Sequence, residues 1–232
     1  DDFAEYQLVL QAVLAEAAAL ALPQPWHLCG QSTGGAILID YLLSGQPGPE
    51  LGQTILLPRP TAQTVMLMGQ PGVKRDDPDW YSAVVMNHVL GGGGQQSRLF
   101  NEVREKRGLT YGVSSGLRTY KRAALLVVST ASANERVADA IRVVRAEIAR
   151  MRTEGVTEQE LADAKTYLSG ALALSLDSSG SVASLMHSLQ VDGLSPDHLV
   201  RREALIAAVK IDSVRRVARR LLREETMTTI VV

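Results

Sequence analysis

The chain has 232 residues, 46% of them hydrophobic, which is enough to bury one full domain or one domain plus a fragment. Its 24 basic and 25 acidic residues give a formal net charge of −1, so nothing attracts it to nucleic acid or to an anionic membrane. No apolar run reaches the roughly 18 residues of a membrane span, and the single cysteine, Cys29, excludes an internal disulfide. We therefore expect a soluble globular protein that binds no nucleic acid and spans no membrane.

Residues 1–45 form the first predicted segment. Residues 3–21 are rich in Ala and Leu and predict a helix that ends at Pro23. A short strand is expected over 26–29, followed by a G-x-S-x-G turn centred on Ser32 and an apolar helix through Leu43. This order of strand, turn and helix resembles the nucleophile elbow of an α/β-hydrolase, with Ser32 as the nucleophile.

A working serine hydrolase also needs an Asp and a His from later strand ends. Asp177 with His187, and Asp192 with His198, keep the required chain order, but both pairs fall in a stretch that we predict to be helical. Esterase or lipase activity through Ser32 is therefore an alternative function and not the leading one.

The chain changes character near residue 45. Gly and Pro are frequent over 45–49, and Pro58 and Pro60 follow closely. Such residues favour turns and remove backbone donors, so we predict a linker over residues 46–60.

The first half of residues 61–232 alternates strands and helices. A strand is predicted over 61–69, and a helix capped by Asp77 or Asp79 is expected to run through Val89 and stop at the glycines 91–94. Ser97 is expected to cap the next helix, which Gly108 ends. Two strands follow, over 110–118 and 123–130.

The second half is mainly helical. A long helix is predicted from Asn134 to Gly155, and Thr157 with Glu160 forms a capping box for a helix that reaches about residue 174. Further helices are expected around 182–189, from Ser195 and Pro196, and from Asp212 to Leu222, before a final strand over 227–232. The order predicts an α+β domain whose mostly antiparallel sheet has helices packed against it.

The sequence from Leu90 to Tyr111, LGGGGQQSRLFNEVREKRGLTY, resembles the signature of the non-zinc domain of pitrilysin/insulinase-type peptidases, which include the mitochondrial processing peptidases. The resemblance extends to QPGVKRDDPD at 70–79 and GVTEQEL at 155–161, and covers roughly residues 58–232. It implies that residues 61–232 are an inactive, substrate-side domain with the fold of the processing peptidases.

This resemblance also implies a partner. In the family, one domain holds zinc on an H-x-x-E-H helix, and another supplies an arginine and a tyrosine, which map here onto Arg104 and Tyr111. The zinc domain is expected either in the same polypeptide or in a second chain of a heterodimer, with a peptide as substrate. Many bacterial relatives are exported, which favours the periplasm over the cytoplasm.

Chemistry supports Arg104 and Tyr111 as a catalytic pair. Peptide hydrolysis builds negative charge on a carbonyl oxygen, and fixed donors directed at that oxygen lower the barrier. Each residue also has an ordinary interpretation, because Arg104 stands in a charged stretch and Tyr111 opens an alternating strand. A third possibility is a purely structural subunit.

No zinc site is predicted on this chain. None of the four histidines (His27, His88, His187 and His198) has a second histidine four residues away with the acidic neighbour that a zinc helix needs. We expect His187 and His198 to lie at the surface or at helix ends. Zinc is expected only on the partner.

The glycine run lacks the Lys-Ser/Thr of a phosphate loop, so helix breaking and close packing explain it better. A substrate strand could still dock there, with Gly92, Gly93, Gly94 and Ser97 as binding residues.

Overall fold

The computed structural model describes residues 52, 54–56, 62–120 and 123–232. The chain divides into two units, Asp1–Glu50 and Leu51–Val232, and only the second contains described residues. The predicted helix over 3–21, the strand over 26–29 and the elbow at Ser32 all lie outside the described residues.

A five-stranded sheet forms the centre of the second unit, with strand order β1-β5-β2-β4-β3. β2 pairs antiparallel with both β4 and β5, β3 pairs antiparallel with β4, and β1 pairs parallel with β5. β3 is therefore one edge of the sheet. The strands are β1 Thr54–Leu56, β2 Thr64–Pro71, β3 Thr110–Thr119, β4 Ala124–Ser132 and β5 Thr228–Val231.

β1 was not predicted, and it lies inside the stretch 46–60 that we assigned to a linker. Residues 54–56 therefore belong to the sheet, where Thr54 pairs with Thr229 and Leu56 with Val231. A strand of three residues is too short to show an alternating pattern, and its partner lies near the far end of the chain. The assignment of the remaining linker residues stays a prediction.

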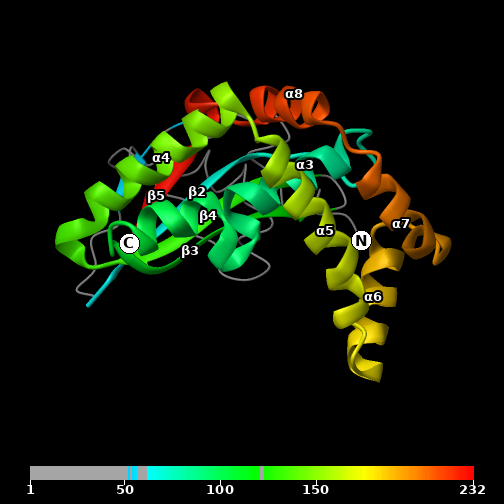
Figure 1. The fold of residues 1–232 in the computed structure, drawn as a ribbon. Coiled ribbons are helices and arrows are strands. Elements are labelled where there is room, and N and C mark those ends of the chain that lie inside the picture. The colour runs from blue at the N-terminus through cyan, green and yellow to red at the C-terminus, as the bar shows by residue number, and fades with distance from the viewer. Residues whose placement is uncertain (1–51, 53, 57–61, 121–122) are drawn as a thin grey trace, which may run out of the picture. The chain divides into compact units, whose positions relative to one another are not determined.

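Six α-helices are described, and they lie largely on one face of the sheet (Figure 1). The predicted α+β fold with a mostly antiparallel sheet is confirmed. The helices are α3 Trp80–Asn87, α4 Val137–Glu154, α5 Glu158–Leu174, α6 Ser179–Val191, α7 Asp197–Ala207 and α8 Ile211–Leu221. Two π-helical segments, η1 His88–Gly92 and η3 Phe100–Glu105, and the 3-10 turns η2 Gly94–Gln96, η4 Asn134–Arg136 and η5 Glu224–Thr226 complete the set of described helical segments.

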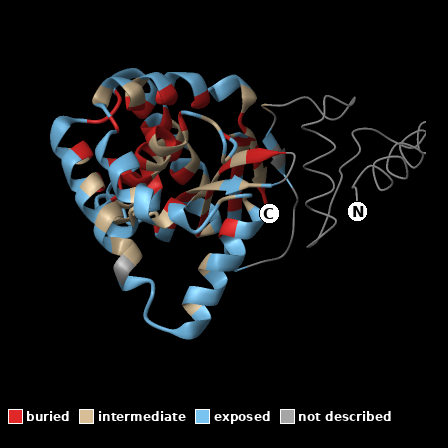
Figure 2. Cartoon of the chain, turned by 90° about the vertical axis from the view of Figure 1, so that its right-hand side faces the viewer, coloured by how far each residue is buried: buried red, intermediate tan, exposed pale blue. Residues whose placement is uncertain are grey.

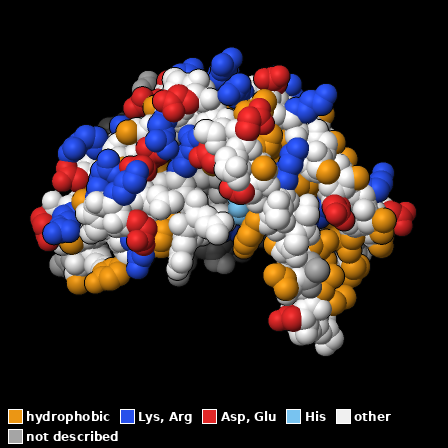
Figure 3. All heavy atoms as spheres, viewed as in Figure 1, with side chains coloured by type: hydrophobic (Ala, Val, Ile, Leu, Met, Phe, Trp, Pro, Cys, Tyr) orange, Lys and Arg blue, Asp and Glu red, His pale blue; other side chains and the backbone are white. Residues whose placement is uncertain are grey.

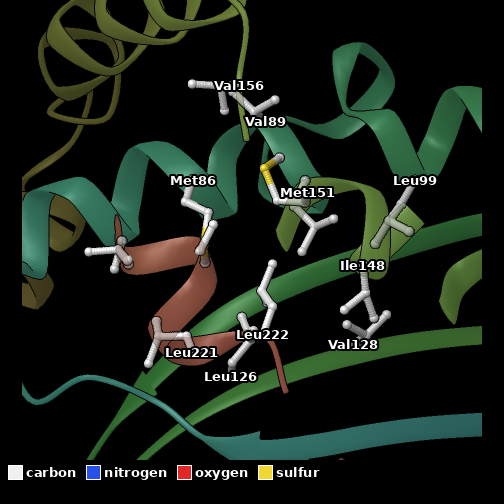
Figure 4. Packing of buried hydrophobic residues seen from close by; sticks show 14 of the residues in the cluster. Met86, Val89, Leu99, Leu126, Val128, Ile148, Met151, Val156, Leu221 and Leu222 are labelled. Carbon is white, nitrogen blue, oxygen red and sulfur yellow. The ribbon is translucent and has the colours of Figure 1, made fainter. Parts of the chain in front are cut away.

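The core lies between the sheet and helices α3, α4 and α8 (Figures 2 and 4). Val144, Ile148 and Met151 of α4, which recur at spacings of four and three residues, are buried there. Leu126 and Val128 of β4 meet them from the sheet. Burial of these side chains removes apolar surface from water, which is the main force that holds the helices on the sheet.

Two predicted helix starts were wrong in detail. Asp79 occupies the N-cap of α3 without a capping hydrogen bond, because its carboxylate pairs with Arg216 and Arg220 of α8. Asp212 lies inside the first turn of α8, whose N-cap is Lys210.

The capping box was predicted correctly. The Glu160 amide donates to Thr157 Oγ1 at 3.1 Å, and the Thr157 amide donates to a Glu160 carboxylate oxygen at 2.7 Å. Within the part of the chain that the structure describes, no helix combines the length and apolarity that a bilayer crossing requires.

Candidate functional site

Arg104 and Tyr111 lie on either side of one tight turn. Ser97 begins the helix before it, because the Phe100 amide donates to Ser97 Oγ at 3.4 Å. Gly108 ends that helix with φ +59°, a backbone conformation that suits glycine. The Gly108 amide donates to the Arg104 carbonyl at 2.8 Å, and β3 starts two residues later. The sequence SRLFNEVREKRGLTY thus fixes where both side chains leave the backbone.

Arg104 is the last basic residue of η3, and its side chain is 41% exposed. Its guanidinium lies 4.9 Å from the centroid of the Phe100 ring, and it pairs with the neighbouring Glu105. An ion pair between adjacent exposed side chains contributes little to stability, so the Arg104 guanidinium is available to a ligand.

The other charges of this helix are used within the fold. Glu102 is buried and accepts hydrogen bonds from Lys106 at 2.5 Å and from Arg107 at 2.6 Å. These two hydrogen bonds lower the pKa of the Glu102 carboxyl. The charged stretch is therefore not uniform, because Lys106 and Arg107 are structural partners of Glu102 while Arg104 is not.

Tyr111 stands on a β-bulge. Thr110 pairs with Ser132 and Val113 with Thr130, so Tyr111 and Gly112 together face a single residue of β4. The side chain of Tyr111 is 88% exposed. The interpretation of Tyr111 as an ordinary packed residue does not hold.

Two threonine hydroxyls stabilise this bulge through hydrogen bonds to Gly112. Thr130 Oγ1 donates to the Gly112 carbonyl at 2.8 Å, and the Gly112 amide donates to Thr110 Oγ1 at 3.2 Å. Both threonines are buried. Bulges often redirect a side chain beside a functional site, and this one directs Tyr111 out of the sheet. No pattern in the sequence predicted the bulge. Among the described residues, no hydrogen bond or ring contact joins Arg104 to Tyr111.

The glycine run differs from the prediction. The helix does not stop before Gly91, because it widens into the π-helical turn η1, which continues through Gly92. A Cβ atom on Gly91 would meet the Ser115 amide nitrogen at 2.6 Å, and one on Gly93 would meet the His88 carbonyl oxygen at 2.8 Å. Close packing therefore explains these two glycines, as expected.

The four predicted substrate-binding residues lie in different environments. A Cβ on Gly92 would meet the Asn87 side chain at 2.5 Å, whereas Gly94 has φ +59° and open space around it. Ser97 is buried, and its hydroxyl donates to the Gly94 carbonyl at 2.7 Å. Of the four, Gly94 is the position with most room for a ligand, while Ser97 shapes the loop from inside.

The described histidines differ in burial. His88 is buried, and its ring lies 4.8 Å from the Tyr167 ring of α5. Burial lowers the pKa of the His88 imidazole. His187 is exposed on α6. His198 lies at a helix end, as expected, but it is buried there, at the start of α7.

His198 and Asp192 belong to a structural cluster. Tyr81 Oη lies 2.6 Å from His198 Nε2, and an Arg75 guanidinium nitrogen lies 2.9 Å from the same atom. Arg75 also pairs with Asp192 at 3.3 Å. These contacts tie the loop before α3 to the α6–α7 connection, and they occupy one of the two Asp and His pairs that a hydrolase triad with Ser32 could use.

Comparison with known proteins gives the family. A family model described as the peptidase M16 inactive domain matches residues 42–168. The chain belongs to the peptidase M16 inactive-domain family. The match begins earlier than the predicted resemblance and includes β1.

Relatives of this M16 domain are longer than it is. An uncharacterized zinc protease of Streptomyces coelicolor is 32% identical over 183 residues, which are 78% of this chain and 39% of the relative. A second one, from Mycobacterium tuberculosis, is 38% identical over 143 residues, covering 60% of this chain and 32% of its own length. The crystal structure of a peptidase M16 inactive domain from Pseudomonas fluorescens is 26% identical, with a TM-score of 0.70, and covers 87% of this chain and 50% of that one.

The described residues of this M16 domain do not fit a zinc ion. Zinc in proteins takes three or four ligands from His, Cys, Asp and Glu. The described part of the chain holds no group of three such side chains that could bind a metal. Of the histidines in the described residues, His88 packs against Tyr167 and His198 contacts Arg75.

Proposed function

We propose that this chain is the substrate-side half of a zinc peptidase, inactive alone, and that it places Arg104 and Tyr111 beside a zinc ion held by an H-x-x-E-H partner. The partner is a second chain or another domain of a longer polypeptide. The observation that carries the proposal is Tyr111, an aromatic side chain that is 88% exposed on a bulge built by buried hydroxyls, one turn away from Arg104.

The two side chains have suitable chemistry for this role. Arg104 carries a permanent positive charge and several N–H donors in a planar fork, and Tyr111 donates one hydrogen bond while neutral. Both can bind carbonyl oxygens of an extended peptide. Donors that are already fixed when charge develops on the reacting carbonyl lower the barrier without further reorganisation. Gly94, with open space around it, is a further position where substrate backbone could approach.

Peptide hydrolysis by this chain mixed with an H-x-x-E-H protein from the same organism tests the proposal. Arg104→Ala and Tyr111→Phe should each reduce kcat/KM by roughly two to three orders of magnitude, the scale of losing one oxyanion donor. Arg104→Lys keeps the charge and loses the fork, so it should restore only part of the rate.

Arg142→Ala is the matched control. Arg142 is an exposed arginine of α4 that pairs with Asp139, three residues before it on the same helix. Its loss should leave the rate unchanged. Unchanged rates for both Arg104→Ala and Tyr111→Phe would instead identify this chain as a purely structural subunit.

A further inference from the structure

The stretch from Thr166 to Val191, which we call the α5–α6 arm, is nearly free of charge. Its 26 residues contain one Asp, Glu, Lys or Arg, namely Asp177, whereas 49 of the 232 residues of the whole chain are charged. At the density of the whole chain, the arm would carry about five. Solvated helix faces in globular proteins are normally rich in charged residues. The arm has the composition of a buried element.

The structure nevertheless leaves the arm exposed. Among its described residues only Leu189 is buried. Figure 1 shows the α5–α6 hairpin projecting away from the sheet, and Figure 2 shows its surface as largely exposed. Hydrophobic side chains gather over it in Figure 3, while charged side chains cover α4 and α8. The large exposed side chains of the arm are Tyr167, Leu174, Leu176, Val182, Met186 and Val191.

Local interactions alone do not account for an ordered α6. Ser178 caps it, because the Ser181 amide donates to Ser178 Oγ at 3.1 Å. A helix of 13 residues is marginal in water without tertiary packing, and α6 contributes one buried side chain. A contiguous exposed apolar surface of this kind marks an interaction site.

We propose that the α5–α6 arm is the surface on which the zinc-bearing half of the peptidase docks. This rests on the proposed function. The Streptomyces relative is matched over only 39% of its length. Such proteins therefore contain a further large portion of chain that is available to pack against this domain. Charged groups buried against the arm would lose hydration without gaining a partner, so the docking face of the occupant is uncharged and apolar.

Tyr167 connects the arm to the candidate site. It lies at the base of the arm and contacts the ring of His88, the first residue of the π-helical turn that leads into the glycine run. A partner held on the arm is therefore anchored to the same turn that positions the loop at 91–94.

Two aspartate substitutions in the full chain test this assignment. Leu174 is 82% exposed and Val191 is 71% exposed, so Leu174→Asp with Val191→Asp should leave the thermal unfolding of the isolated chain unchanged. Affinity for a zinc-loaded H-x-x-E-H protein from the same organism, measured by titration calorimetry, should fall at least tenfold. Val200→Asp is the control, because Val200 is 83% exposed on α7, outside the arm. It should bind as the unsubstituted chain does.

The outcomes separate this assignment from the proposed function. If the substituted arm binds with unchanged affinity and the mixture remains active, the arm assignment is overturned and the proposed function stands. If the arm substitutions abolish binding but Arg104→Ala keeps full activity, the arm is supported and the catalytic role is not. If they only turn a dimer of this chain into a monomer, the occupant is a second copy and the assignment fails.

Discussion

At the scale of single residues, the account depends on how the backbone presents Tyr111. The side chain projects because a bulge replaces regular pairing at Thr110–Val113, and Thr110 and Thr130 hold that bulge. The residue identity could be taken from the sequence, but its exposure could not. An alternating strand pattern describes faces of a regular strand and carries no signal for an extra residue.

Gly108 gives a prediction of its own at this scale. Its φ of +59° costs other residues roughly 1–2 kcal/mol, while a Cβ there would meet no other atom within 4 Å. Gly108→Ala should therefore lower the free energy of unfolding by about that amount, measured by chemical denaturation. Gly116→Ala is the control, since Gly116 also has open space but no positive φ. An equal loss in both variants would contradict the explanation.

At the scale of elements, the helices followed their sequence signals better than the strands did. The capping box at Thr157 was readable because its two partners stand three residues apart. β1 was missed because its only pairing is with the terminal strand β5, which no local pattern reveals. The π-helical turn at His88–Gly92 was missed because Gly91 and Gly93 serve packing rather than termination.

Arg98 and Glu160 tie the segment just before η3 to α5, and their pairing gives a further prediction. Arg98 is buried and makes two 2.6 Å hydrogen bonds to the Glu160 carboxylate, while also reaching the Gly155 carbonyl at 2.8 Å. Burial raises the pKa of Glu160, but hydrogen bonds from Arg98 and the Thr157 amide outweigh it, and the pKa is lowered overall. Glu160→Gln should lower the free energy of unfolding by about 2 kcal/mol. This is less than the loss for a fully buried pair, because Glu160 is 29% exposed.

The sign of the pH dependence follows from the direction of that shift. A carboxyl with a lowered pKa in the folded state adds stability above its ordinary value of 4.5, and this stability is lost as the pH falls below 4.5. The free energy of unfolding of Glu160→Gln, measured from pH 3 to pH 6, should therefore change less steeply with pH than that of the unsubstituted chain. A parallel slope would show that the pair does not titrate as described.

His198 gives another prediction at this scale, now in the near-neutral pH range. Burial, followed by Arg75, Arg201 and Arg202, lowers its pKa below 6.5, and Asp192 opposes them. The neutral ring is favoured in the folded state. The contribution of His198 to the free energy of unfolding is therefore complete above pH 6.5 and declines as the pH falls through and below that value.

The variant His198→Gln should show a shallower decline, measured as unfolding free energy between pH 5 and pH 8, while the buried His88 still contributes a decline of the same sign. His187→Gln should keep the full decline, because His187 is exposed on α6. If both variants behave as the unsubstituted chain does, the cluster around Arg75 and Tyr81 does not depend on the charge of His198.

At the scale of the whole molecule, the family match and the fold agree that the chain is a peptidase M16 inactive domain. The fold class was predictable from the order of elements, and the family from the sequence around Gly91–Tyr111. The exposed hydrophobic arm was not predicted, because an apolar helix in a sequence gives no indication of whether the fold will cover it.

The elbow around Ser32 gives a prediction at this scale. A fluorophosphonate probe should leave Ser32 unlabelled, because His198 and Asp192, one of the two pairs in the required order, are engaged with Arg75. Labelling that Ser32→Ala removes would revive the hydrolase alternative.

The most direct test of the central claim is hydrolysis of an unstructured peptide by this chain, by a zinc-loaded H-x-x-E-H protein from the same organism, and by their mixture. The account predicts activity in the mixture alone, lost with a chelator and strongly reduced by Arg104→Ala. Chelator-insensitive hydrolysis by this chain without a partner would contradict it.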